Sequence, residues 1–249
     1  MSAVAALFAH PDDETYATGG TLARCAAEGV RVSLYCATDG DAGQSSGIPV
    51  SNRAELGALR RAELRAACEV LGIAAVVHGG HGDGMLASAD PDLVIGEMVR
   101  LLRLERPDVV LTFGPEGAPT MHRDHRAVSR LATSAVLLAG TPTAFPEQLA
   151  DGLRPHRAAR LCYVTWPPPV AGDPYQVDGQ PVQIAVAVRK WLPRKREAFL
   201  AHRTQRQHEA AFERAAMTDN ECYFVALGTP APAGAGWVMD GLTPGRRDR

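Results

Sequence analysis

Short apolar runs alternate with longer amphipathic segments through the first half of the chain. The runs "AVAALFA" and "VRVSLYCAT" are rich in apolar, β-branched and aromatic residues, as buried strands are. Between them, "TGGTLARCAAEGV" spaces its apolar residues as one face of a helix does. The pattern then repeats, because "RAELGALRRAELRAACEVLG" leads to "IAAVVHGG" and "PDLVIGEMVRLLRLERP" leads to "DVVLTFGP". This alternation predicts an α/β fold of Rossmann-like type, with a mostly parallel sheet and helices on both faces.

The pattern changes after residue 140. The segments "RLCYVTWPPP" and "VQIAVAV" predict two strands joined by a Pro/Gly-rich connection, and "KWLPRKREAFLAHRTQRQHEAAFERAAM" predicts one helix that begins near Pro193. We expect these elements to form a small C-terminal β/α extension of a single domain, residues 1–228. The Gly/Pro-rich tail, residues 229–249, is expected to be flexible or to lie on the surface.

Composition narrows the choice of partners. The chain has 249 residues, with 26 basic and 28 acidic side chains, so nothing demands a nucleic acid or an anionic membrane as partner. A small-molecule ligand fits better. The five cysteines are scattered and never form a CxxC pair, which argues against disulfides or a thiolate metal site. Without a signal-like or transmembrane run, we expect a cytoplasmic protein, and a homo-oligomer is left open.

Two polar motifs follow predicted strands. "HPDDE" comes directly after the first strand and presents His10, Asp12 and Asp13, while "MHRDHR" follows "DVVLTF" and presents His122 and His125. Ligands of open α/β sheets bind beyond the carboxyl ends of the strands, so the two motifs are candidates for one site. Two histidines, one carboxylate and a water form a catalytic zinc site. Each motif alone has a plainer interpretation as a helix cap or a surface feature.

These motifs resemble those of the LmbE-like, or PIG-L-type, N-acetylglucosaminyl deacetylase superfamily. Further similar stretches are "GGTLA", "ATDGDAG", "RRAELRAACEVLG", "GDGML", "LTFGPEG" and "KREAFLAHRTQ", so the resemblance extends over residues 3–227. It implies a zinc ion held by His10, Asp13 and His125, although Fe(II) or another divalent metal is an alternative. It also implies that Asp12 is the general base and that His122 supports the tetrahedral intermediate and protonates the departing amine.

The resemblance also suggests supporting residues and substrate contacts. Asp124 is expected to orient a histidine, and Glu14 to hydrogen-bond either His10 or the loop backbone. Candidate contacts to an N-acetylated sugar are Arg60, Arg61, Asp83, His81 and His202.

The implied activity is hydrolysis of the acetamide of an N-acetylglucosamine conjugate. Some sugar-inositol deacetylases of this superfamily carry a tyrosine where this chain has Thr120, so we expect N-acetylglucosaminyl malate, as in a bacillithiol-type pathway. Alternatives are an inositol conjugate, a chitooligosaccharide and a thiol S-conjugate amide. Two other classes are a non-haem iron oxygenase, whose ligands usually lie on a β-barrel, and a sugar-binding module without catalysis. A binding module would have no need of Asp12 as a base.

Overall fold

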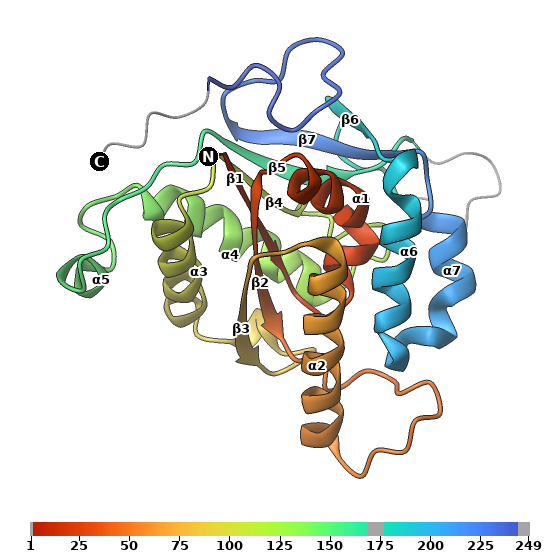
Figure 1. Ribbon diagram of the computed structural model, residues 1–249. Helices are drawn as coiled ribbons and strands as arrows, with labels where there is room; N and C mark the ends of the chain where they lie inside the picture. Colours follow the sequence, from red (N-terminus) through yellow and green to blue (C-terminus); the bar gives the residue numbers. More distant parts are fainter. Residues whose placement is uncertain (1, 169–176, 244–249) are drawn as a thin grey trace.

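One mixed sheet runs through the computed structural model, which describes residues 2–168 and 177–243 (Figure 1). Within these residues the strands are β1 (Ala3–Phe8), β2 (Arg31–Thr38), β3 (Ala75–His81), β4 (Val109–Phe113), β5 (Arg160–Thr165), β6 (Ile184–Ala187) and β7 (Asn220–Gly228). Their order across the sheet is β3-β2-β1-β4-β5-β7-β6. The first five strands in this order are parallel, and β7 is antiparallel to both of its neighbours. The predicted α/β fold is confirmed.

Helices cover both faces of the sheet, as predicted. They are α1 (Asp13–Ala27), α2 (Arg53–Leu71), α3 (Pro91–Glu105), α4 (Arg123–Ala139), α5 (Pro146–Ala150), α6 (Leu192–Ala201) and α7 (Glu209–Ala215), with 3-10 turns η1 (Leu86–Ser88), η2 (Arg189–Trp191) and η3 (Arg203–His208). Helices α1, α2 and α6 pack together on one face, and α3 and α4 pack on the other (Figure 1). None of the described helices combines the length and hydropathy needed to cross a membrane.

The two central strands position the site. Every residue of β1 and of β4 is buried, as expected for strands covered by helices on both faces. The chain moves outward from β1 to β3 and then returns to β4 on the other side of β1. In open α/β sheets, ligands bind in the crevice at such a reversal, which here falls beside the loops that follow β1 and β4.

The predicted C-terminal extension is present, with two differences. Strand β7 was not predicted, because "NECYFVALG" begins with polar residues, yet it joins β5 to β6. The single helix predicted from Pro193 is wrong, since the segment divides into α6, η3 and α7. The break falls at His202, whose ψ of 68° leaves the helical region, and the next turn bonds to α2 rather than continuing the helix.

The described part of the tail, residues 229–243, is anchored to the sheet. The buried guanidinium of Arg160 donates hydrogen bonds to four of its carbonyl oxygens, at 2.7–3.0 Å. Val238 is fully buried, and Arg24 lies over the ring of Trp237. These contacts hold the described part of the tail against the rest of the domain, and residues 244–249 lie outside the described residues. A domain boundary at residue 228 stays a prediction.

Candidate metal centre and active site

The two polar motifs meet in the crevice. His10, Asp12 and Asp13 lie between β1 and the first turn of α1, while His122 and His125 lie at the N-terminus of α4. The ring centroid of His10 lies 4.8 Å from that of His122 and 5.2 Å from that of His125. Segments that are far apart in the sequence therefore form one cluster of imidazoles and carboxylates.

Asp13 shapes its loop with one carboxylate oxygen and presents the other to the cluster. Its Oδ2 accepts hydrogen bonds from the backbone N–H groups of Ala9 and His10, at 3.1 and 2.8 Å. Its Oδ1 lies 3.1 Å from Nε2 of His125. Burial opposes ionisation, but the neighbouring histidines hold the pKa of Asp13 well below its usual range. Asp13 is therefore ionised, as a metal ligand must be.

Four possible ligand atoms from three residues, among them both carboxylate oxygens of Asp13, lie close to one another. Nδ1 of His10 lies 3.3 Å from Nε2 of His125 and 3.4 Å from Oδ2 of Asp13, and Nε2 of His125 lies 3.1 Å from Oδ1 of Asp13. Tetrahedral zinc with bonds of about 2.0–2.1 Å separates its ligand atoms by about 3.3 Å. The side chains present therefore fit zinc or a similar divalent ion.

The outer nitrogens of the two histidines fix which nitrogen is free to bind. Nδ1 of His125 lies 3.2 Å from the carbonyl oxygen of Gly117, which only accepts, so this nitrogen carries the proton and Nε2 keeps its lone pair. Nε2 of His10 faces carboxylate oxygens of Asp83 and Asp124, at 3.2 and 3.4 Å. Burial opposes the charge of His10, but Asp124, Asp13 and Asp83 raise its pKa well above the usual value, so His10 must lose a proton before Nδ1 can bind a metal. Carbonyl and carboxylate partners of this kind orient metal-binding histidines.

Among the described residues, two groups have ligand atoms that all lie within 4.8 Å of one another, and the predicted set of His10, Asp13 and His125 is neither of them. One comprises His10, His122 and His125, and the other comprises His10, Asp83 and Asp124. In the first, Nδ1 of His122 is engaged, because it accepts the backbone N–H of Asp124. In the second, both carboxylates approach the Nε2 side of His10. The resemblance favours His10 Nδ1, Asp13 and His125 Nε2 as the ligand set, and this set stays a prediction.

His122 has a defined tautomer beside this set. It is the N-cap of α4, and its Nδ1 accepts the backbone N–H of Asp124 at 3.2 Å. Burial, together with His10 and His125, lowers the pKa of His122, which favours the neutral ring. A neutral ring whose Nδ1 accepts must carry its proton on Nε2. His122 therefore offers one N–H donor.

Asp12 is a carboxylate held in an unusual backbone conformation. Its φ of 113° is rarely adopted by a residue with a side chain, and such strain is concentrated at functional sites. Burial raises the pKa of Asp12 to about 6, although Arg60, whose Nη2 lies 3.6 Å from Oδ1, opposes the rise. The side chain is 17% exposed and is not part of the favoured ligand set. Asp12 is therefore free to exchange a proton near neutral pH.

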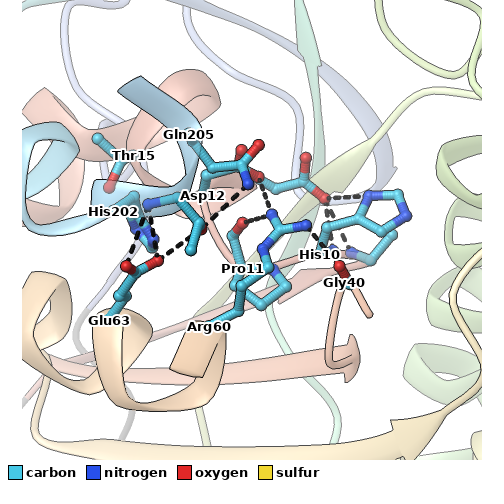
Figure 2. Close-up of polar contacts among 12 residues, drawn as sticks. His10, Pro11, Asp12, Thr15, Gly40, Arg60, Glu63, His202 and Gln205 are labelled. Carbon is cyan, nitrogen blue, oxygen red and sulfur yellow. Dashed lines mark hydrogen bonds and ion pairs between the residues drawn. The ribbon is translucent and has the colours of Figure 1, made fainter. Parts of the chain in front are cut away.

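Arg60 and His202, both predicted to contact the sugar, are instead bound to protein. Arg60 is 4% exposed and donates to the carbonyl oxygens of Pro11 and Gly40, at 2.6 and 2.8 Å (Figure 2). His202 is fully buried, and its Nε2 lies 2.8 Å from Oε1 of Glu14. Neither side chain is open to a ligand in this structure, which argues against both predicted sugar contacts.

The expected supporting residues lie around the ligands. Glu14 bonds the loop backbone, because its Oε2 accepts the N–H of Asp12 at 3.0 Å. Asp124 is fully buried, accepts two backbone N–H groups from the segment around η1, and faces Nε2 of His10. Asp83 was predicted to contact the sugar, but its carboxylate also faces Nε2 of His10. A direct contact between Asp83 and the sugar stays a prediction.

Two further candidates lie apart from the ligands. Arg61 forms an ion pair with Asp39, and its side chain is 36% exposed. His81 is the last residue of β3, and its Nε2 lies 2.9 Å from the carboxylate of Glu97, which also accepts the hydroxyl of Tyr35. Their contacts with a substrate stay predictions.

Sequence reasoning missed Glu63, Thr204 and Gly117. Glu63 lies three residues after Arg60 on the same buried face of α2, a spacing that helix periodicity could have shown. Thr204 bonds Glu63 through both its N–H and its hydroxyl. Gly117 contributes only its backbone carbonyl oxygen, a contact that the residue type does not reveal.

Comparison with known proteins agrees with the resemblance seen in the sequence. Residues 5–136 match the family model PIG-L, described as GlcNAc-PI de-N-acetylase. This match covers more than half of the chain. The protein belongs to the PIG-L family, and the predicted membership is confirmed.

Individual relatives extend the match beyond that region. A Rhodococcus erythropolis protein named 1D-myo-inositol 2-acetamido-2-deoxy-alpha-D-glucopyranoside deacetylase is 32% identical over 269 residues, covering 91% of each chain. A Bacillus cereus protein named probable N-acetyl-alpha-D-glucosaminyl L-malate deacetylase 2 is 37% identical over 134 residues, covering 53% of this chain and 60% of its own. The structure of N,N'-diacetylchitobiose deacetylase from Pyrococcus horikoshii has a TM-score of 0.74 at 23% identity, covering 90% of this chain and 83% of that one. The last likeness concerns the fold alone.

Proposed function

We propose that the protein is a divalent-metal-dependent deacetylase that hydrolyses the acetamide of an N-acetylglucosamine conjugate. One observation carries the proposal. Nε2 of His125 lies 3.3 Å from Nδ1 of His10 and 3.1 Å from Oδ1 of Asp13, beside a carboxylate, Asp12, and an N–H donor, His122. Membership of the PIG-L family and the names of its relatives support the same reaction class.

Amide hydrolysis makes three demands, since an amide is a weak electrophile with a poor leaving group. The carbonyl must be polarised, a nucleophile must be available near neutral pH, and the departing nitrogen must be protonated. A zinc ion held by His10, Asp13 and His125 would supply polarisation of the carbonyl and acidification of the attacking water.

Asp12 meets the demand for a base. With a pKa raised to about 6 by burial, its carboxylate is mostly ionised at pH 7 and can accept the proton that the attacking water loses. The carboxylic acid so formed can then pass this proton to the departing nitrogen. Asp12 would thus act first as general base and then as general acid. General acid or base assistance is typically worth about a hundred- to ten-thousand-fold in rate.

His122 meets the demand for charge stabilisation. The proton on Nε2 of its neutral ring can be donated in a hydrogen bond to the carbonyl oxygen as negative charge develops there. A neutral imidazole is a poor acid, so the lowered pKa of His122 favours hydrogen bonding over delivery of a proton to the amine. This assignment changes the role expected from the sequence, in which His122 also protonates the amine.

The candidate substrates differ in the group that is joined to N-acetylglucosamine. The malate conjugate expected from Thr120 is supported by a relative that covers 53% of the chain. The inositol conjugate is supported by relatives that cover 79–93%. We therefore place N-acetylglucosaminyl inositol beside N-acetylglucosaminyl malate as candidate substrates.

An amine-release assay tests the proposal. Protein loaded with zinc is incubated with N-acetylglucosaminyl inositol, N-acetylglucosaminyl malate and N,N'-diacetylchitobiose, and primary amine and acetate are measured in parallel. We expect equimolar amine and acetate from at least one conjugate, with activity lost on chelation and restored by added metal. If metal-loaded protein releases no amine and no acetate from any of the three substrates, the proposed function is rejected.

A further inference from the structure

The break in the C-terminal helical segment places a histidine inside the protein. His202 is fully buried and Glu14 is 1% exposed, and Nε2 of His202 lies 2.8 Å from Oε1 of Glu14. A carboxylate only accepts hydrogen bonds, so His202 is the donor. Buried from water, this charge-assisted bond strongly restrains the Glu14 side chain.

The other oxygen of Glu14 holds the backbone of Asp12. Oε2 accepts the N–H of Asp12 at 3.0 Å, while Oε1 also accepts the hydroxyl of Thr15 at 2.5 Å. Asp12 needs this restraint, because its φ of 113° is a strained conformation of the kind that costs about 1–3 kcal/mol. Because both carboxylate oxygens of Glu14 are hydrogen-bonded, Glu14 resists relaxation of the Asp12 loop toward an ordinary backbone conformation.

Helix α2 completes the restraint from the opposite side. Glu63 accepts the N–H of Thr204 at 3.1 Å and its hydroxyl at 2.6 Å, which fixes the turn directly after His202. One helical turn earlier, Arg60 donates to the carbonyl oxygen of Pro11. Figure 2 shows Arg60 and Glu63 approaching the Asp12 loop and His202 from the same helix. The closed ring runs through Asp12, Glu14, His202, Thr204, Glu63, Arg60 and Pro11.

We propose that His202 is a positioning residue for the general base, which acts through Glu14 to fix the backbone, and hence the carboxylate, of Asp12. This inference rests on the proposed function. Full burial excludes contact between His202 and a substrate, and the hydrogen bonds of His202 and Glu14 touch none of the ligand atoms. Loss of His202 should therefore misplace the base and leave metal binding in place.

Three variants test the proposal. His202→Leu removes the donor at similar volume, and His202→Gln keeps an N–H donor that can reach Glu14. Thr204→Val removes only the hydroxyl bond to Glu63, which gives a milder perturbation if His202→Leu does not fold. The matched control is His156→Leu, because Nε2 of His156 bonds the carbonyl of Pro107 beyond the opposite end of β4 from the site.

Two readouts separate positioning from a merely structural role. In His202→Leu, kcat should fall about tenfold to a hundredfold, the scale on which misplaced catalytic groups lose rate, while KM and zinc content stay within about twofold of wild type. His202→Gln should recover most of the lost kcat, and Thr204→Val should lose less. In His156→Leu, kcat should not change. Unchanged kcat in both His202→Leu and Thr204→Val would overturn the proposal, as would a loss of kcat that tracks loss of zinc.

The second readout does not depend on catalysis. Amide hydrogen exchange in a peptide spanning residues 9–16 should be about tenfold faster in His202→Leu than in wild type, and close to wild type in His202→Gln and His156→Leu. Equal exchange in His202→Leu and wild type would overturn the positioning role. If wild-type protein hydrolyses none of the three conjugates, the proposed function fails, and exchange alone then decides whether His202 fixes the Asp12 loop.

Discussion

Replacing Asp13 by Asn should abolish tight metal binding and leave the protein folded. An Asn side chain can turn its carbonyl oxygen to the N–H groups of Ala9 and His10, which now bond Oδ2 at 3.1 and 2.8 Å. Its amide NH2 then occupies the place of Oδ1 and has no lone pair for a metal. We expect zinc affinity to fall at least about a hundredfold, or about 2.7 kcal/mol.

Asp13→Ala is the matched comparison, because it removes the ligand and both hydrogen bonds to the loop. Hydrogen bonds to a charged group are worth about 1.5–3 kcal/mol each, so metal-free Asp13→Ala should unfold with a free energy about 3–6 kcal/mol below wild type. Metal-free Asp13→Asn should lose about 1–2 kcal/mol, since it keeps both bonds in neutral form. Urea denaturation of the metal-free proteins and competition with a chromophoric chelator give the two quantities. Zinc affinity of Asp13→Asn equal to wild type, or equal stability of the two variants, would refute this reasoning.

The remaining predictions concern His122 and a buried ion pair. His122→Asn keeps a good N-cap for α4 but removes the Nε2 donor, so kcat should fall about a hundred- to a thousandfold with unchanged Tm. An unchanged kcat, or a lowered Tm, would contradict this. Lys195→Met should lower the free energy of unfolding by about 3–5 kcal/mol, because Glu221, 2.7 Å from the buried ammonium, is left unpaired. Its kcat per folded molecule should be unchanged, and denaturation with parallel assays checks both statements.

The sequence predicted the sheet and the cluster well, because both depend on local patterns. Strands β1 and β4 could be predicted from their apolar composition alone. The proximity of His10 and His125 could be predicted because sites of open α/β sheets lie beyond the carboxyl ends of the strands. Strand β7 and the break at His202 were missed for a shared reason. Each is set by contacts with residues far away in the chain, such as the bonds between Thr204 and Glu63.

The roles of individual side chains were harder to predict than their proximity. Arg60 and His202 have polar groups of the kind that bind sugars, but only their burial and their partners show that they hold the loop. Asp12 and Asp13 are adjacent and chemically identical, and only the resemblance to the deacetylase superfamily divided their roles. Their surroundings in the structure differ, because Asp13 faces His125 while Asp12 lies beside Arg60 in a strained conformation.

The central claim is that Asp12 is the base of a metal-dependent deacetylase and is not itself a ligand. Its most direct test is Asp12→Asn, assayed for amine release on the conjugate that wild type hydrolyses best, with zinc content measured on the same sample. We expect one zinc per chain, as in wild type, and a kcat lower by about a hundred- to ten-thousand-fold. A variant that retains zinc together with wild-type kcat, or one that loses zinc and activity in parallel, would contradict the assignment.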